Sequence, residues 1–184
     1  MGDVCSIKRG DLRQALVEYA QSATKDGTIE TLSLRSVARE LGVSSGAVYR
    51  HFPDKEALMI EVVRLGWMSL REEFHAIRPK DQVASSVDEA LQRCFRVGQT
   101  YVSFAMANPT LWRLMFGRIG QICREVMSQD PDLLSYTVLD VAEECARDLH
   151  RLGLLDTAPC TADTRILWRA LHGAADLVQS GARL

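Results

Sequence analysis

The chain has 184 residues, of which 47% are hydrophobic and 25% are charged, and its formal net charge is -2 at pH 7. This composition is that of an ordinary globular protein and excludes a disordered or collagen-like chain. The near-neutral charge carries no global signature of nucleic-acid binding, so such binding would have to come from a few locally placed residues.

The cysteines and the N-terminal residues indicate which kinds of site and which cellular location to expect. The cysteines are an odd number and widely spaced, without a C-x-x-C motif or paired histidines nearby, so neither a disulfide framework nor a zinc site is predicted. We interpret most of them as small buried hydrophobic residues, with a redox-sensing thiol as the alternative. Residues 1–13 lack the apolar core of a signal peptide, and we expect a cytoplasmic protein without a membrane partner. The five cysteines are Cys5, Cys94, Cys123, Cys145 and Cys160.

Apolar residues recur at intervals of three and four rather than two, which predicts an all-α fold. Ser33 and Asp54 are good N-caps, and Asp130 followed by Pro131 is a cap with proline at the first helical position. Glycines at 117 and 120 interrupt whatever continues to residue 127. The helices expected in chain order lie at about residues 7–25, 34–41, 45–51, 54–77, 87–107, 111–116, 131–153 and 161–181.

Two of these helices have the spacing of a helix-turn-helix motif. They are short and are separated by the tight turn Gly42-Val43-Ser44. The second begins with Ser45-Gly46-Ala47 and is too short to be stable alone. Its small residues permit close approach to base edges, and its N-terminus favours a phosphate. The motif therefore predicts a helix that reads DNA.

Residues 34–58, LRSVARELGVSSGAVYRHFPDKEAL, resemble the DNA-binding domain of the TetR family of transcriptional regulators. The C-terminal part resembles one branch of that family through the run Trp168-Arg169-Ala170-Leu171-His172-Gly173, a tryptophan-histidine-glycine signature. The resemblance implies an N-terminal three-helix helix-turn-helix domain at residues 1–53 and a linking helix at 54–78. It also implies a helical effector-binding and dimerisation domain at residues 79–184.

The resemblance assigns roles to individual residues of the motif. Arg35, Ser45, Gly46 and Ala47 would approach bases or adjacent phosphates, and Tyr49, His51 and Lys55 would hold phosphates. Lysine in the first turn of a helix is unfavourable for the helix dipole, which independently suggests an external anion at Lys55. The helical pattern also directs Ser36 and Arg50 outward. The alternatives are a core aromatic role for Tyr49 and a solvated surface position for Arg50.

A cluster of aromatic and sulfur-containing side chains in the second domain is a candidate effector site. Such clusters are more often core, but the same helices enclose the effector cavity in this family. A histidine on an otherwise apolar helix is either a satisfied core residue or a ligand hydrogen-bonding group. The candidate residues are Phe95, Tyr101, Phe104, Trp112, Met115, Phe116 and His172.

The sequence is interpreted as a ligand-responsive repressor that binds a near-palindromic operator as a homodimer. Its expected partners are double-stranded operator DNA, a small apolar or amphipathic effector and a second copy, which would dimerise through residues 134–149 and 167–178. Relatives with this signature often continue beyond residue 184, so we expect a shorter dimer surface. No catalytic constellation, cofactor motif or metal spacing is found. The alternatives are an activator of the same fold, or an all-α enzyme with His172 as acid or base.

Overall fold

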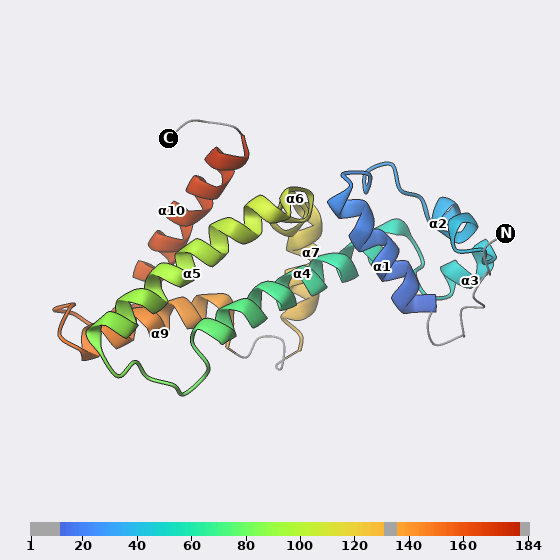
Figure 1. The fold of residues 1–184 in the computed structure, drawn as a ribbon. Helices are drawn as coiled ribbons and strands as arrows, with labels where there is room; N and C mark the ends of the chain where they lie inside the picture. Colours follow the sequence, from blue (N-terminus) through green and yellow to red (C-terminus); the bar gives the residue numbers. More distant parts are fainter. Residues whose placement is uncertain (1–11, 131–135, 181–184) are drawn as a thin grey trace. The chain divides into compact units, whose positions relative to one another are not determined.

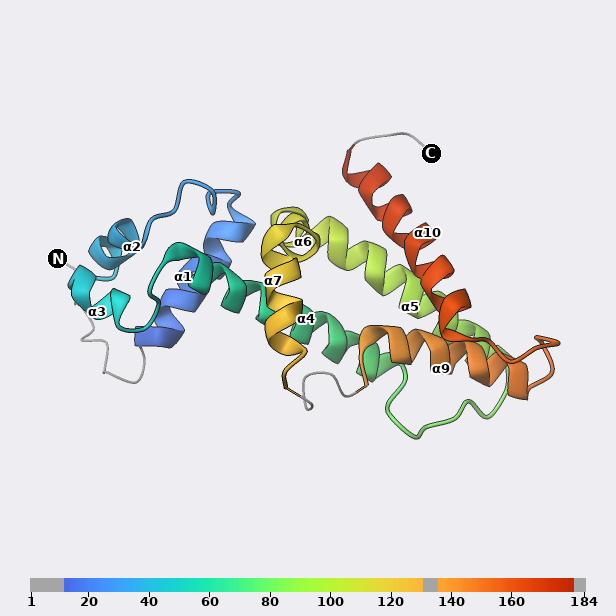
Figure 2. The same ribbon diagram turned by 180° about the vertical axis from the view of Figure 1, so that it is seen from behind.

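The structure is a computed structural model that describes residues 12–130 and 136–180. Within these ranges every regular element is a helix and none is a strand, which confirms the all-α prediction. The chain forms two compact units, and the long helix α4 (Lys55–Ile77) contributes to both (Figures 1 and 2). None of the helices in the described ranges is long and apolar enough to cross a membrane.

The first unit comprises Met1–Gly66 and Thr110–Val126. Its core is formed by fully buried aliphatic side chains, among them Leu16, Ile29, Val37, Val48 and Leu58. These residues come from helices and turns far apart in the sequence, so a single apolar cluster holds the short helices in place. The helices of this unit, besides the first part of α4, are α1 (Leu12–Lys25), α2 (Leu34–Glu40), α3 (Ser45–Tyr49), α6 (Pro109–Phe116) and α7 (Arg118–Met127).

Two glycines permit close approaches within this unit. A Cβ added at Gly66 of α4 would lie 3.1 Å from side-chain atoms of Leu111 and Met115 on α6. A Cβ added at Gly120 of α7 would lie 1.8 Å from the carbonyl oxygen of Met115. The residues 110–126 therefore pack tightly onto α4 and onto one another because glycine has no side chain at these positions.

The second unit comprises Trp67–Pro109 and Met127–Leu184. In it α5 contacts both α9 and α10, and α9 also contacts α10. The apolar faces of these helices meet the second part of α4, whose Leu70 and Phe74 are fully buried. The helices of this unit, besides the second part of α4, are α5 (Val87–Ala107), α9 (Val138–Arg151) and α10 (Thr161–Gln179).

A buried ion-pair network joins the end of α4 to α9. The Arg78 guanidinium donates from Nε to Asp148 Oδ2 at 3.1 Å and from Nη2 to Glu144 Oε2 at 3.0 Å. The Asp148 carboxylate also accepts from the backbone N–H of Ala84 at 3.2 Å and from Arg151 Nη2 at 2.6 Å. These several partners compensate the loss of hydration that burial imposes on the charges.

Most of the expected helix bounds agree with the structure. α5 spans 87–107 as predicted, α4 ends at Ile77, and α2 follows the capping residue Ser33. α3 ends at Tyr49, two residues earlier than expected, and α10 ends at Gln179. The expected first helix is described only from Leu12, because the earlier residues lie outside the described ranges.

The prediction of one helix running on from Pro131 is wrong at its start. α9 begins at Val138, after the N-cap Thr137, whose hydroxyl accepts from the Asp140 N–H at 3.3 Å. The preceding Tyr136 has a φ of 52°, a left-handed conformation that a continuing α-helix does not contain. Pro131 itself lies outside the described residues. The cap that determines this helix is therefore Thr137 with Asp140.

Candidate functional site

Local hydrogen bonds define the first helix of the motif. The Ser33 hydroxyl accepts from the Ser36 N–H, and the Ser36 hydroxyl accepts from the Ser33 N–H, each at 3.1 Å. This reciprocal capping box satisfies backbone donors that a helix N-terminus otherwise leaves without partners. The side chain of Ser36 is consequently part of the cap of α2.

The turn between α2 and α3 requires a glycine. Gly42 has a φ of +66°, in the left-handed region that other residues rarely adopt. Its N–H donates to the Arg39 carbonyl at 3.2 Å, and the N–H of Val43 donates to the Ala38 carbonyl at 2.9 Å. This pattern is a Schellman motif, which ends α2 and redirects the chain into α3.

The helix α3 is fixed by one cap and one buried side chain. The Ser44 hydroxyl accepts from the Ala47 N–H at 3.2 Å, and Val48 is fully buried in the core of the first unit. Ala47 is half-buried and packs against the same core. The remaining side chains of α3 are exposed, including Tyr49 at 43%. α3 thus exposes small side chains and the Tyr49 phenol to solvent, while Val48 holds the helix against the core.

The residues predicted to bind DNA all lie in the first unit, on or next to α2, α3 and the start of α4. Arg35, Ser45, Gly46 and Arg50 are exposed, and His51 is half-buried. No atom comes within 4 Å of a Cβ built at Gly46, so packing within the described chain does not require a glycine there.

Lys55 has an internal partner. Its Nζ donates to the carbonyl oxygen of Glu30 at 2.6 Å, which holds the ammonium against the segment between α1 and α2. An ammonium has three donors, so this bond leaves capacity for a phosphate oxygen. Asp54 caps the same helix end by accepting from the Ala57 N–H at 2.8 Å.

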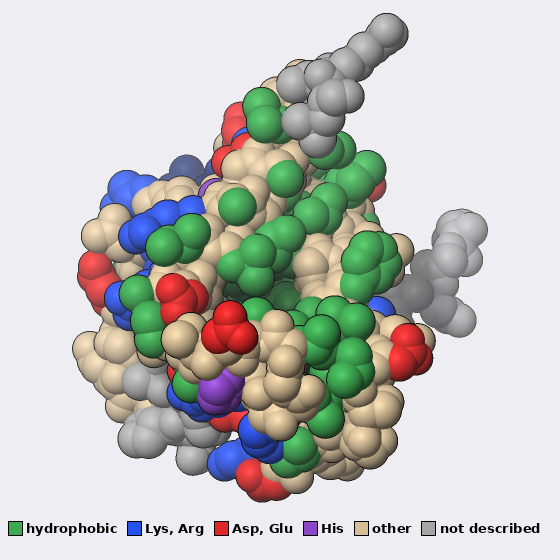
Figure 3. Space-filling model, turned by 90° about the vertical axis from the view of Figure 1, so that its left-hand side faces the viewer, with side chains coloured by type: hydrophobic (Ala, Val, Ile, Leu, Met, Phe, Trp, Pro, Cys, Tyr) green, Lys and Arg blue, Asp and Glu red, His purple; other side chains and the backbone are tan. Residues whose placement is uncertain are grey.

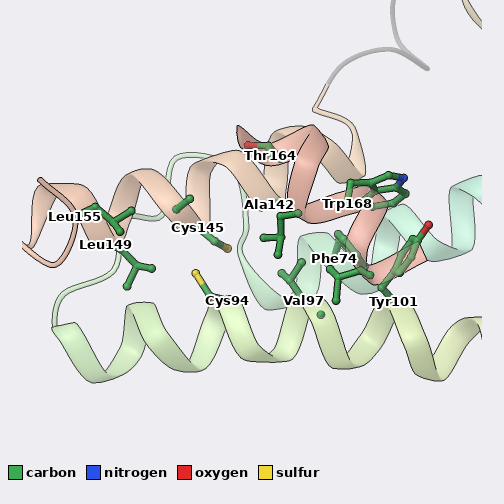
Figure 4. A pocket seen from close by; sticks show the side chains of 14 residues that line it. Phe74, Cys94, Val97, Tyr101, Ala142, Cys145, Leu149, Leu155, Thr164 and Trp168 are labelled. Carbon is green, nitrogen blue, oxygen red and sulfur yellow. The ribbon is translucent and has the colours of Figure 1, made fainter. Parts of the chain in front are cut away.

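The second unit contains an apolar cavity of about 270 Å³ between α4, α5, α9 and α10 (Figure 4). Its volume is near the lower end of the range for small-molecule sites, and such sites are mostly apolar with a few placed polar groups. Its lining residues are Phe74, Cys94, Val97, Gly98, Tyr101, Ala142, Cys145, Ala146, Leu149, Leu155, Thr164, Leu167, Trp168 and Leu171.

Polar groups gather at one end of this cavity. The Tyr101 hydroxyl is hydrogen-bonded to His172 Nδ1 at 3.0 Å, and the rings of Tyr101 and Trp168 lie 4.1 Å apart. His172 Nε2 lies 3.6 Å from Asp176 Oδ2. Burial, together with the charge of Asp176, raises the pKa of Tyr101 well above its usual range, so its hydroxyl stays protonated and can donate or accept a hydrogen bond.

The structure brings only some of the predicted effector-site residues together. Tyr101 lines the cavity and His172 is bonded to it, whereas Phe104 is buried beside the cavity lining without being part of it. Phe95 is 72% exposed and lies outside the lining. The other three belong to the first unit, where the rings of Trp112 and Phe116 lie 4.4 Å apart; they are Trp112, Met115 and Phe116.

Several cavity residues were missed by sequence reasoning. The main ones are Trp168 on α10, the thiols of Cys94 and Cys145, and the small and aliphatic face of α9. The signal available was the helical repeat of Ala142, Cys145 and Leu149, at intervals of three and four. Reasoning that favoured large aromatic residues passed over this face.

α10 carries exposed apolar side chains along much of its length. Ile166 and Leu177 are 63% and 46% exposed, and Ala170 and Gly173 between them are also exposed. These four residues follow a spacing of four, three and four, which places them on one stripe. Figure 3 views the side of the chain that bears α5, α9 and α10, and shows hydrophobic side chains gathered around a hollow. In contrast, the apolar residues of α9 such as Val141 are buried.

Two family models match the chain, one in its N-terminal part and one in its C-terminal part. The model described as bacterial regulatory proteins, tetR family, matches residues 26–62, which contain α2 and α3. The model described as tetracyclin repressor-like, C-terminal domain, matches residues 94–183, which contain most of the cavity lining. Together they cover more than two thirds of the chain.

Individual proteins agree with these matches. The nucleoid occlusion factor SlmA of Vibrio vulnificus is 31% identical over 116 residues, covering 63% of this chain and 55% of SlmA. An uncharacterized HTH-type transcriptional regulator of Haemophilus influenzae is 33% identical over 88 residues, covering 47% of this chain and 43% of the other. The chain thus spans about half the length of the curated relatives it matches.

A solved structure supports the fold over nearly the whole chain. A TetR/AcrR-family regulator of Thermobifida fusca has a TM-score of 0.64 at 19% identity, covering 91% of this chain and 83% of the other. With a helix-turn-helix in one unit, a helical cavity in the other and matching models for both, the chain belongs to the tetR family of bacterial transcriptional regulators.

Proposed function

We propose that the chain is a ligand-responsive repressor that binds a near-palindromic operator as a homodimer and is released by a small apolar or amphipathic effector. The observation that carries this proposal is the apolar cavity of about 270 Å³ in the same chain as the helix-turn-helix motif. A DNA-binding element and an apolar site for a small molecule are the two parts that a ligand-controlled regulator needs.

The DNA-binding residues divide by the part of DNA that they contact. Ser45, Gly46 and Ala47 approach base edges, because small side chains at the start of α3 let its backbone enter the major groove. Arg35, at the start of α2, contacts bases or neighbouring phosphates. Phosphates are bound by Tyr49, His51, Lys55 and Arg50, while Ser36 adds its backbone and cap hydroxyl next to Arg35.

Dimerisation uses the exposed stripe of α10. Ile166, Ala170, Gly173 and Leu177 form an apolar face that a second copy would cover by two-fold symmetry. The small residues at its centre allow two α10 helices to approach closely. A dimer is needed because one short recognition helix contacts too few bases, and two of them read half-sites about 34–36 Å apart. The operator is therefore near-palindromic.

The effector is small and mostly apolar, with one polar group directed at Tyr101. The lining supplies aliphatic side chains and the Trp168 ring, while the Tyr101 hydroxyl and His172 offer a hydrogen bond at one end. Phe74 brings α4 into the lining, and α4 continues without a break to Lys55. An effector that prefers a shifted α4 lowers operator affinity by its differential binding, typically about 5- to 150-fold.

The test combines the selection of an operator with two variants in which a lysine is replaced by alanine. Operator fragments are selected from the host's genomic DNA with the purified chain, and affinity is then titrated against salt. Lys55→Ala should weaken binding to every duplex and lower the slope of log affinity against log salt by about one. Lys80→Ala, an exposed lysine in the second unit, is the matched control and should change neither. Thermal melting checks that loss of the Lys55 bond to Glu30 leaves the fold intact.

Three results would contradict the proposal. The first is a salt slope that is the same for Lys55→Ala and the parent chain. The second is a monomer, in sedimentation at micromolar concentration, that binds a single half-site tightly. The third is the absence of any operator-affinity change with a panel of small apolar compounds that do bind the cavity by tryptophan fluorescence.

A further inference from the structure

Two thiols face each other inside the cavity of the second unit. Cys94 projects from α5 and Cys145 from α9, and both line the cavity. Figure 4 shows the two sulfur atoms directed toward one another between these helices. Each thiol affects the pKa of the other, which agrees with this close placement. The pair therefore brings two thiols together at the wall of one apolar space.

The interaction between the two thiols shifts their pKa values in opposite directions. It lowers the pKa of Cys94, against opposing effects of burial and of the Asp148 charge. The same interaction, reinforced by burial, raises the pKa of Cys145. Because the thiolate is the reactive form of cysteine, this difference favours Cys94 as the thiol of the pair that reacts first.

The two other cysteines in the described ranges lack this arrangement. Cys123 is buried in the first unit, and burial raises its pKa to about 11, which suppresses its thiolate. Cys160 is exposed at the start of α10, away from the cavity lining. These two provide internal controls for a reaction that is specific to the pair.

We propose that Cys94 and Cys145 form a reactive site that reduces an organic hydroperoxide entering the cavity and closes to a disulfide. This rests on the proposed function, because it takes the effector cavity to be the place where the reagent binds. An apolar lining that includes Val97, Leu149 and Leu171 favours a hydroperoxide with a hydrocarbon group over hydrogen peroxide.

The reaction balances in two steps. The Cys94 thiolate attacks the terminal oxygen of the hydroperoxide, the O–O bond breaks, and the products are a sulfenic acid on Cys94 and an alkoxide, which takes a proton and leaves as the alcohol. The Cys145 thiol then gives its proton to the departing hydroxyl as its sulfur attacks the sulfenic sulfur, so that the S–S bond forms and water leaves. The two thiols lose two electrons, which the hydroperoxide gains.

Closure of the bond changes the packing of α5 against α9. The two sulfurs must approach to about 2.05 Å in a disulfide, so the helices shift at this level and the cavity changes shape. Asp148 lies one turn after Cys145 on α9 and holds Arg78, the residue that follows α4. Oxidation therefore acts on the helix that anchors the end of α4.

The experiment uses the full reduced chain under anaerobic conditions. Equal concentrations of cumene hydroperoxide and hydrogen peroxide are added, and non-reducing peptide mass spectrometry follows the products over time. We expect a peptide pair linked between Cys94 and Cys145, formed at least about tenfold faster with cumene hydroperoxide because apolar groups concentrate in apolar sites. Equal rates with the two reagents would overturn the assignment to organic hydroperoxides.

Variants separate the roles of the two thiols. Cys94→Ser should abolish oxidation at the pair, and Cys145→Ser should leave Cys94 as a sulfenic acid that dimedone traps. Cys160→Ser should behave like the parent chain. Oxidation of Cys160 before the pair, or an undiminished reaction in Cys94→Ser, would overturn the proposal. Circular dichroism melting of each variant, and of Cys94→Ala as a second substitution at the same position, shows whether a lost reaction is caused by loss of the fold.

Operator binding distinguishes this proposal from the one on which it rests. A reduced chain that selects no operator but still forms the linkage contradicts the repressor function and supports the thiol chemistry. A chain that binds its operator but forms no linkage contradicts the thiol chemistry alone. When both hold, the oxidised chain should show an operator affinity changed within the range of about 5- to 150-fold typical of allosteric coupling.

Discussion

The guanidinium of Arg78 and the carboxylate of Asp148 are joined by a 3.1 Å hydrogen bond, with side chains that are 2% and 0% exposed. Removal of one partner leaves the other buried without its counter-charge. Asp148→Ala should therefore lower the free energy of unfolding by about 3–5 kcal/mol. Urea denaturation followed by circular dichroism measures this change.

The matched control for that substitution is an exposed ion pair. Arg118 and Glu56, whose side chains are 71% and 39% exposed, pair with each other. Because water screens exposed charges, Arg118→Ala should cost less than about 1 kcal/mol. Equal effects of the two substitutions would show that the buried pair contributes no more than a surface contact.

Gly46→Ala should separate stability from DNA binding. No atom lies within 4 Å of the added Cβ, and alanine favours a helix over glycine by about 0.5–1 kcal/mol, so the melting temperature should hold or rise. The added methyl group would occupy the space between α3 and the base edges, so affinity for the selected operator should fall. Lys80→Ala, at an exposed position in the second unit, is the control and should leave the operator affinity unchanged. An unaltered affinity in Gly46→Ala would remove Gly46 from the interface.

Glu61 should contribute acid-sensitive stability to the first unit. Hydrogen bonds from Arg64, at 2.9 Å, and from Arg13, at 3.0 Å, lower its pKa from 4.5 to about 2, against an opposing effect of burial. A carboxyl whose folded-state pKa is depressed stabilises the fold above its unfolded pKa, and this stability is lost as the pH falls from about 4.5 to 2. Exposure of Arg13 screens the effect to about 1 kcal/mol or less.

The corresponding variant is Glu61→Gln. Its free energy of unfolding, measured by urea titration at several pH values, should depend less steeply on pH below 4.5 than that of the parent chain. Glu18→Gln, an exposed residue of α1, serves as the control. A pH dependence in Glu61→Gln that matches the parent would assign the acid sensitivity to other groups.

Gly120→Ala should destabilise the first unit. The new Cβ would lie 1.8 Å from the Met115 carbonyl oxygen, a backbone atom that cannot move without displacing α6 from α7. Overpacking of this kind typically costs about 1–3 kcal/mol or more. Hydrogen exchange should locate the loss of protection to α6 and α7. A melting temperature equal to that of the parent chain would show that the turn before α7 relaxes freely.

Local signals made the helices predictable, because each cap lies within three residues of the group it satisfies. Ser33 with Ser36, and the left-handed Gly42, are visible in the sequence and set the bounds of α2. The start of α9 could not be found in this way. Asp130 and Pro131 are a sound local signal, but a left-handed Tyr136 whose carbonyl lies 2.8 Å from His75 Nε2 is a matter of tertiary structure.

The residues that line the cavity were harder to predict from the sequence than the helix-turn-helix motif. α6 has the same aromatic character as a cavity wall, yet its Trp112 packs in the first unit because Gly66 of α4 lets α6 approach there. Which helix faces which depends on contacts between residues far apart in the chain, such as Tyr101 with His172. The individual DNA and effector contacts stay predictions, since they concern molecules outside the chain.

The unbroken course of α4 has a mechanical consequence. Its 23 residues, at 1.5 Å per residue, make a rod about 34 Å long, with Lys55 at one end and Ile77 at the other. A rod of this length works as a lever: a tilt of about 3° about one end displaces the other by about 2 Å, which exceeds the tolerance of a hydrogen bond in length. If Lys55 binds a phosphate as we propose, a rearrangement near Phe74 that is too small to unfold any helix would be large enough at Lys55 to break that contact.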